Sequence, residues 1–526
     1  MSLSMMLSKS VCVSILSVVI AGCSVAPKTL NSQSVMANAA ENSNLLKKEV
    51  APITRPIDLN EAFARTIKYN RDARLKAFEA VVSQGQLAVD QFDMLPELAV
   101  KAGYSRRDNY AASASVSFTD GEPAALGNDP SYSVSSDKST ISASIGATWD
   151  ILDFGLSYYR AKQQADRFLI SKERERKVVH TIMEQSRSAY YRAVSAERIL
   201  AKINPLIIKA RKALADSARI EQLRAQSPME ALTYQRALLE SLRTLQDNRK
   251  SLMTAKAELA TLMGLNPSDT FELVDVKNPN FMTPHLAFDI KAMERTALVH
   301  RPELREAQYN ERITQEEVHS AFLSLFPSLN LNMGVNYNDS DYLLNNNWTS
   351  AGMGVNWNLM NVFRYGKIEK LNQLKIAASK QQALATSMAV ISQVHIADAQ
   401  FKESINSYQL ASQYHDVAQR IKTQVYSNRV SQSVGDLAVI REDLNELLAE
   451  LRRDVAYAEL QNNYGKVFVS MGIDPLPDGF GSMSLDQLSG AFKQLQKKWL
   501  QGDIALISQE SMQAAYDSKK IEHEGI

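Results

Sequence analysis

Four stretches of the chain alternate between apolar residues and polar or small ones. In residues 327–337 every second position is apolar or aromatic, and the positions between are Ser, Asn or Gly. A period of two predicts a β-strand with one apolar and one polar face. Residues 96–104 show the same pattern as 327–335, at an offset of 231 positions. Residues 143–149 and 351–357 match each other at an offset of 208. The pattern therefore predicts two pairs of related strands.

The offsets indicate that a whole structural unit is duplicated. The sequence M-G-L-N-P at 263–267 corresponds to M-G-I-D-P at 471–475, again at an offset of 208. The fall from 231 to 208 means that the first half has a loop 23 residues longer between its strands. Residues 57–287 and 288–476 are thus predicted as two repeats, each with a helix, a strand, a loop, a strand and a long helical hairpin.

The helical segments are unusually long. Residues 57–93 and 288–324 are predicted as helices that end before the prolines of the strands. After the second strand of each half, turns are expected to run to Gly155 and Gly366. The long helices that follow would each span roughly 100 Å. The returning helices carry leucine-type residues spaced by three, four and seven, as in side-by-side helices: Leu238, Leu242, Leu245, Leu252, Leu259, Leu437, Ile440, Leu444, Leu447 and Leu451. These helices alone would indicate a coiled-coil scaffold.

The strands favour a membrane protein instead. Nine to eleven alternating residues suffice to cross a bilayer when tilted. The apolar faces carry Tyr104, Trp149, Tyr337 and Trp357, which are candidates for an aromatic girdle. Four strands cannot close a barrel, and an open sheet edge cannot face lipid, so the chain would have to oligomerise. The alternative is a half-buried sheet in a soluble protein.

The amino terminus has the pattern of a lipoprotein signal peptide. Lys9 precedes an apolar run over 11–20 that ends in Ile-Ala-Gly-Cys, which predicts cleavage after residue 22 and acylation of Cys23. Ser24 at the next position favours transfer to the outer membrane. Residues 23–56 are polar and are predicted to be an acylated tether. The alternative is that the first apolar residues pack in a core.

Composition excludes several classes of function. Without the signal peptide, the 59 basic residues fall to 58, equal to the 58 acidic ones, so nothing indicates a nucleic-acid partner. No run of eighteen apolar residues predicts a transmembrane helix. Neither a phosphate-binding loop nor a catalytic or metal-binding motif is present, and the seven histidines are scattered. We therefore expect no enzymatic activity, cofactor or metal site.

The set of motifs resembles that of TolC-type outer-membrane efflux proteins, the outer membrane factor lipoproteins. It comprises the L-P strand starts, the W-D-I-L-D-F-G turn and the M-G-x-x-P ends, and covers residues 57–477. The resemblance implies an α+β membrane protein, a homotrimer with a 12-stranded β-barrel, four strands per chain, continued by a periplasmic α-helical barrel. It also implies an export duct in the outer membrane of a Gram-negative bacterium, for type I protein secretion, small-molecule efflux or polysaccharide export. Its implied partners are a periplasmic adapter, an inner-membrane pump or ABC transporter, and outer-membrane lipid. The alternative from another class is a periplasmic coiled-coil structural lipoprotein.

The helical hairpins break at 226–230 and 432–436. A serine and an acid correspond in the two breaks, with Glu230 and Asp436 as the acids. One interpretation is helix capping, since an acid in the first turn suits the helix dipole. The other is a periplasmic entrance where these carboxylates crowd a constriction, as the resemblance implies. A basic residue that locks the closed state in some members of the family falls on Gln432 here, and Arg429 is the candidate substitute.

The last fifty residues form a separate segment. Residues 477–526 are predicted to contain an amphipathic helix whose apolar face is formed by Leu485, Leu488, Phe492, Leu495 and Trp499. Such a helix could serve as a strap around the helical barrel or bind a membrane surface.

Overall fold

The structure is a computed structural model of the chain. It describes residues 27–127, 129–223, 227–274, 281–286, 288–430, 436–477 and 479–524. The chain forms two compact units, residues 1–53 and 54–526. None of the helices in the described ranges is long and apolar enough to cross a membrane.

The described part of the first unit contains one helix. Helix α2 (Ser32–Lys48) begins after Asn31, whose side chain accepts a hydrogen bond from the backbone of Ser34 at 2.7 Å. Most of its residues are exposed. The segment 23–56, predicted as a tether, thus includes a solvent-exposed helix.

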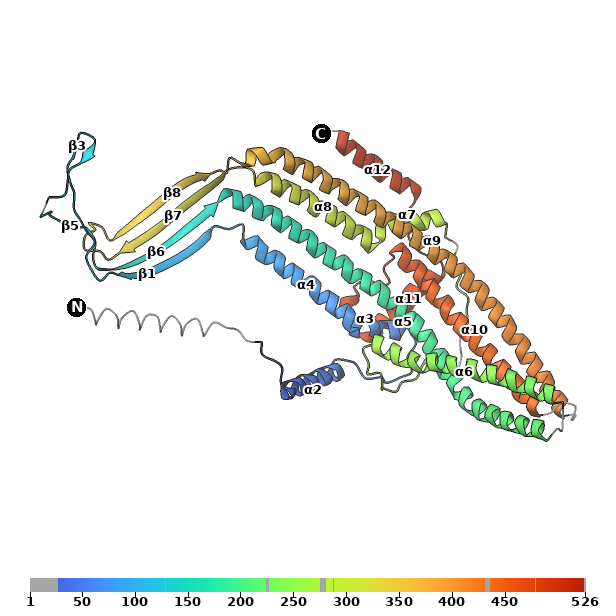
Figure 1. The fold of residues 1–526 in the computed structure, drawn as a ribbon. Coiled ribbons are helices and arrows are strands. Elements are labelled where there is room, and N and C mark those ends of the chain that lie inside the picture. Colours follow the sequence, from blue (N-terminus) through green and yellow to red (C-terminus); the bar gives the residue numbers. More distant parts are fainter. Residues whose placement is uncertain are drawn as a thin grey trace. The chain divides into compact units, whose positions relative to one another are not determined.

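The second unit contains a four-stranded antiparallel sheet in the order β1-β6-β7-β8 (Figure 1). The strands are β1 (Glu97–Arg106), β6 (Ser139–Asp150), β7 (Ser328–Asn338) and β8 (Asn347–Asn356). These are the four predicted strands, and pairing of β6 with β7 joins the two halves of the chain. Strands β1 and β8 form the two open edges.

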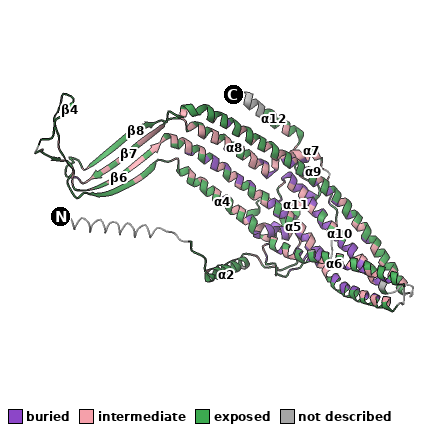
Figure 2. Ribbon diagram, in the orientation of Figure 1, coloured by how far each residue is buried: buried purple, intermediate pink, exposed green. Residues whose placement is uncertain are grey.

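The register gives the sheet two chemically different faces. Paired residues share a face, so Val100, Ile145 and Val335 form one apolar row and Lys101, Ser144 and Asn336 form a row on the other side. Large apolar side chains on the apolar face are exposed: Leu98, Val100, Tyr104, Ile141, Ile145, Met333, Val335, Tyr337, Met353 and Val355. Figure 2 shows that the outer strands β1 and β8 are mostly exposed, that β6 and β7 mix exposed and intermediate residues, and that buried residues follow the helices.

The longer loop of the first half, residues 107–138, contains two small two-stranded ladders. They are formed by β2 (Ala112–Ser113) with β5 (Ser133–Val134), and by β3 (Phe118–Thr119) with β4 (Glu122–Pro123). At the base of this loop, the Asp137 carboxylate accepts hydrogen bonds from Ser340 Oγ and from the backbone N–H of Asp341, both at 2.9 Å. The two strand connections are therefore tied together.

Helices occur in the same order in both halves. The first half has α3 (Leu59–Tyr69), α4 (Arg71–Phe92), α5 (Ile151–Gln222) and α6 (Pro228–Leu262). The second has α7 (Ile290–His300), α8 (Pro302–Leu323), α9 (Asn361–Val430) and α10 (Asp436–Met471). Helices α4, α5, α8 and α9 pack side by side, each continuing a strand of the sheet (Figure 1). The long helices α5 and α9 have 72 and 70 residues, as predicted.

The predicted helices 57–93 and 288–324 are each divided in two, which is a correction. The break lies at Asn70 in one half and at Arg301 in the other, and both residues have extended backbone with ψ near 130°. Arg301 precedes Pro302, which disfavours helical backbone. Asn70 caps α4, because its side chain accepts hydrogen bonds from the backbone of Asp72 and Ala73.

The M-G-x-x-P sequences pack against these breaks. Gly264 and Gly472 each end a returning helix with φ of +73° and +71°, a left-handed conformation that favours glycine. A Cβ at Gly264 would lie 2.7 Å from Tyr69 O, and one at Gly472 would lie 2.6 Å from the carbonyl carbon of His300. The glycines therefore allow each returning helix to reach the gap in the preceding helical pair.

The turns expected to end at Gly155 and Gly366 are shorter than predicted. Helix α5 already begins at Ile151, capped by Asp150, and α9 begins at Asn361. Gly155 lies inside a helix, where a Cβ would approach Leu323 Cδ2 to 2.6 Å. Gly155 thus permits close packing of α5 on α8, and no glycine is needed for the turn.

Two apolar clusters hold the helices together. One joins α5 to both returning helices and includes the predicted leucines Leu238, Leu242, Leu245, Leu252, Leu444, Leu447 and Leu451. The other joins α7, α9 and α10 and contains Phe401, Tyr464 and Phe468. The heptad-like spacing therefore corresponds to packing within the chain.

The carboxyl-terminal segment packs on the second cluster. It comprises the 3-10 helix η2 (Phe480–Ser482), α11 (Leu485–Leu500) and α12 (Gln509–Glu524). In α11, Phe492 contacts Phe63 with ring centroids 5.6 Å apart, and Trp499 stacks on Phe468 at 4.2 Å. The apolar face of α11 is thus covered by α3 and α10.

Asp474 fastens the end of α10 to α5. Its Oδ1 accepts hydrogen bonds from Arg176 Nε at 2.5 Å and from His180 Nε2 at 2.8 Å. Burial opposes ionisation of this carboxyl, but the hydrogen bonds from His180 and Arg176 outweigh burial and lower its pKa to about 2. These two hydrogen bonds link residues almost 300 positions apart in the chain.

Candidate functional site

The end of the first helical hairpin places Glu230 in the first turn of α6. Helix α6 begins at Pro228, and Ser227 is its N-cap residue. The Ser227 side chain makes no capping hydrogen bond. The capping interpretation therefore holds here only for the acid at the positive end of the helix. Glu230 forms no ion pair among the residues that the structure describes.

An ion pair connects the two helices at the end of the second hairpin. Arg429, in the last turn of α9, lies with Nη2 2.9 Å from Asp436 Oδ1 at the start of α10. The side chains are 49% and 75% exposed, so the pair is a weak one. Ser433 and Gln432 lie outside the described residues. Asp436 therefore has a basic partner within its own hairpin. The crowding of Glu230 and Asp436 carboxylates at an entrance stays a prediction, because it concerns several copies of the chain.

Further polar contacts connect α9 and α10 above this end. Lys422 Nζ lies 3.2 Å from both Asp443 Oδ1 and Glu446 Oε2. Tyr426 donates its hydroxyl hydrogen bond to Asp443, with O···O distances of 3.0 and 3.2 Å. Together with the terminal pair, these contacts form a ladder along the second hairpin.

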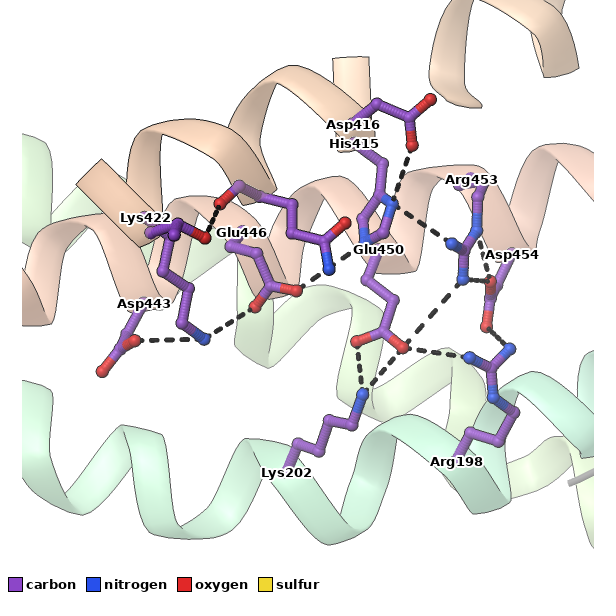
Figure 3. A network of polar contacts seen from close by, with 12 residues as sticks. Arg198, Lys202, His415, Asp416, Lys422, Asp443, Glu446, Glu450, Arg453 and Asp454 are labelled. Carbon is purple, nitrogen blue, oxygen red and sulfur yellow. Dashed lines mark hydrogen bonds and ion pairs between the residues drawn. The ribbon is translucent and has the colours of Figure 1, made fainter. Parts of the chain in front are cut away.

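The ladder leads to a buried network that joins α5 to α10 (Figure 3). Arg198 donates to Glu450 Oε1 at 3.0 Å and to Asp454 Oδ2 at 2.8 Å. Lys202 Nζ donates to both oxygens of Glu450 at 2.6 and 2.7 Å. Arg453 donates to Asp454 Oδ1 at 2.8 Å. The network thus fixes the two hairpins to each other through charged groups.

Burial decides the charge state of the two carboxylates in this network. Burial raises the pKa of Asp454, against the effect of Arg198 and Arg453. Burial also opposes ionisation of Glu450, but the Lys202 hydrogen bonds and the neighbouring cations outweigh it and lower the pKa. Their side chains are 2% and 5% exposed, so loss of a partner would leave a buried charge.

An aromatic ring and a histidine complete the network. The Arg453 guanidinium lies 4.5 Å from the ring centroid of Phe281, and its Nη1 lies 3.2 Å from His415 Nδ1 on α9. His415 therefore joins α9 to the charged network between α5 and α10. The sequence did not identify these residues, although Glu450 and Asp454 have an i,i+4 spacing beside the leucine stripe.

The four predicted girdle residues lie at two levels of the sheet. Tyr104 and Tyr337 lie near the ends of β1 and β7 that lead into the loops. Trp149 is paired with Leu331 at the helical end, and Trp357 follows the end of β8. Leu331, the partner of Trp149, lies six residues from Tyr337 along β7, so the two levels are about 20 Å apart at this point. Their role as a girdle stays a prediction.

The remaining site predictions fall elsewhere. Cys23, the predicted lipidation site, lies outside the described residues. Across the described ranges, no group of three or more His, Cys, Asp or Glu side chains is arranged to hold a metal ion.

Part of the sequence matches a known family. Residues 295–432 match the outer membrane efflux protein family. A comparison with curated proteins finds no match.

Solved structures show the same fold over most of the chain. The outer membrane channel CmeC of Campylobacter jejuni has a TM-score of 0.59 at 14% identity, with 84% of this chain and 89% of CmeC covered. The open state of the MtrE outer membrane channel of Neisseria gonorrhoeae has a TM-score of 0.60 at 14% identity, with coverage of 81% and 95%. CusC, solved in a study of transmembrane channel formation, has a TM-score of 0.56 at 16% identity, with coverage of 81% and 96%.

Proposed function

We propose that this chain, a member of the outer membrane efflux protein family, is the outer-membrane exit duct of a tripartite export system. The family membership rests on residues 295–432, which match the family. The duct would pass substrates from the periplasm to the exterior and would have no enzymatic activity of its own. A periplasmic adapter and an inner-membrane pump or ABC transporter would supply the cargo and the energy. The cargo would be small molecules or a secreted protein.

The exposed apolar face of the sheet is the observation that carries this proposal. Val100, Met333 and Val355 are between 66% and 75% exposed and are surrounded by other apolar residues of the same face. A water-exposed sheet would not favour such a face, whereas lipid would cover it. The opposite face carries mainly Ser, Asn and Gly, together with Lys101 and Trp348, and would line an aqueous lumen.

The edges of the sheet and of the helical layer support closure of a ring. β1 and β8 are unpaired edges, and the helices that continue them, α4 and α9, are the outer members of the helical layer. Both helices expose large apolar residues: Phe78, Val82, Phe92, Leu374, Leu384 and Met388. Copies packed edge to edge would cover these surfaces and pair the open strands at the same time. Three copies would give 12 strands, the number that the family resemblance implies.

The helical end of the duct would be its periplasmic entrance. Glu230 and Asp436 lie at the ends of the two hairpins, so in a ring each would be repeated around the mouth. Lipid on Cys23 would attach the amino terminus to the outer membrane. The aromatic residues at the two levels of the sheet would mark the bilayer surfaces.

Reconstitution of the full-length protein tests the proposal. Protein extracted from membranes should have the mass of three chains in detergent and should form ion-conducting channels in a planar lipid bilayer. A control with the strand pair β7 and β8 replaced by a short linker should give no channels. A single-chain mass together with no conductance would refute the duct and favour the structural lipoprotein.

A further inference from the structure

A single lysine lies in the middle of the polar face of the sheet. Lys101 is exposed on β1, in a row with Ser144 on β6, Asn336 on β7 and Trp348 on β8. Its ammonium forms no ion pair in the described parts of the chain. The other residues of the row carry no charge, so Lys101 sets the local charge of this part of the face.

The side chains next to Lys101 are small. Ala99 and Gly103 flank it on the same face of β1, and Ser142 and Gly146 lie diagonally across on β6. A long, flexible lysine stem surrounded by Ala, Gly and Ser has room to extend away from the sheet. The ammonium is therefore the group on this stretch best placed to meet a solute.

Acidic groups that could neutralise Lys101 are distant or engaged. Glu97 lies four residues along β1, about 13 Å away along the strand. Asp150 caps α5 by accepting hydrogen bonds from the backbone of Leu152 and Asp153. In a closed ring the strand beside β1 would be β8 of the next copy, and Asn347–Asn356 contains no acidic residue. Ring closure would thus leave Lys101 without a counter-ion.

We propose that Lys101 forms an anion-binding collar inside the strand section of the duct, with one ammonium from each copy. This inference rests on the proposed function, because it requires the polar face to line a lumen. Ammonium groups grouped around a water-filled passage attract phosphate-, sulfate- or carboxylate-bearing solutes. The collar would be opposite in sign to the acidic residues at the hairpin ends, so the strand section and the hairpin ends would attract ions of opposite charge.

Block of single-channel current by inorganic tripolyphosphate tests the collar. Wild-type channels should be blocked at low ionic strength, with the block weakening as salt screens the ammonium charges. Lys101→Gln should weaken the apparent affinity for tripolyphosphate roughly tenfold, because three charges are lost at exposed positions. Lys101→Arg should retain the block, since the charge is kept.

Arg106→Gln is the matched control. Arg106 lies on the same strand but on the opposite face, so this variant should be blocked like the wild type. Equal block of wild type and Lys101→Gln, or no block of wild type, would overturn the collar while leaving the duct intact. Absence of conductance in the wild type and in every variant would instead overturn the proposed function, and the collar with it.

Discussion

Removal of Arg198 should loosen α10 from α5. Arg198 is 14% exposed and donates hydrogen bonds to two carboxylates on the neighbouring helix (Figure 3). Arg198→Met retains a similar side-chain length but removes the charge and all five donors. Glu450 and Asp454 would then depend on their remaining partners.

The expected loss is about 2 kcal/mol of local stability. Breaking a buried ion pair from one side costs about 3–5 kcal/mol, because the other charge stays buried without its partner. Here Lys202 still donates to Glu450 and Arg453 still donates to Asp454, so the loss is smaller. A loss of about 2 kcal/mol corresponds to a roughly 30-fold larger population of the locally open helix at 25 °C.

Hydrogen–deuterium exchange of the assembled protein measures this effect. Amides of α10 around Glu450 should exchange roughly 30-fold faster in Arg198→Met. Lys402→Met is the control, because the Lys402 side chain is 70% exposed and its ion pair with Asp398 lies within α9, outside the network, so its loss should cost less than about 1 kcal/mol. Equal exchange in wild type and Arg198→Met, or an equal effect of both variants, would show that the network does not hold the hairpins together.

Three further predictions concern other parts of the chain. Asp474→Asn should lower the free energy of unfolding at pH 7 by about 1 kcal/mol, a value reduced by the 54% exposure of the side chain. Because the pKa is lowered in the folded state from 3.8 to about 2, this stabilisation should be lost as pH falls through that range, and melting temperatures of wild type and variant should converge near pH 2. Divalent cations added on the periplasmic side should reduce the conductance of the channel. Glu230→Gln should relieve this block more than Asp436→Asn, because Asp436 is already paired with Arg429. An unchanged block in the double variant would show that both acids are only helix-capping residues. Cys23→Ser should abolish incorporation of a palmitate analogue without preventing folding, and label on the variant would place the lipid elsewhere.

Local patterns sufficed to predict the strands. Each strand alternates with a period of two, and the offsets of 231 and 208 identify the equivalent strand in the other repeat. The apolar spacing does not predict the breaks at Asn70 and Arg301, because it continues across both, even though Pro302 marks one of them. The role of Gly155 cannot be predicted from local patterns, since close packing against Leu323 depends on a helix more than 160 residues away.

The polar contacts between hairpins could not be predicted in the same way. Arg198 and Glu450 are 252 positions apart, and many other charged pairs on the helices have equivalent spacing. Only the rotation and register of α5 against α10 decide which charges meet. The pairing of Asp436 with Arg429 is more local, because the two residues lie at the two ends of one hairpin. The sequence names Arg429 only through the family resemblance, as a substitute for a basic residue, and does not predict this ion pair.

The most direct test of the central claim, that the sheet is the wall of a membrane barrel, compares charges on its two faces. The structure places Ile145 and Val335 in a row between the two levels of aromatic residues, with Ser144 and Asn336 next to them on the polar face. Arginine at Ile145 or Val335 should lower the stability of the assembled protein by about 2–4 kcal/mol, whereas arginine at Ser144 or Asn336 should cost less than about 1 kcal/mol. The amount of heat-resistant oligomer in the outer membrane fraction measures the difference. Strong loss for the apolar-face variants alone would support the barrel, and equal loss for both faces would contradict it.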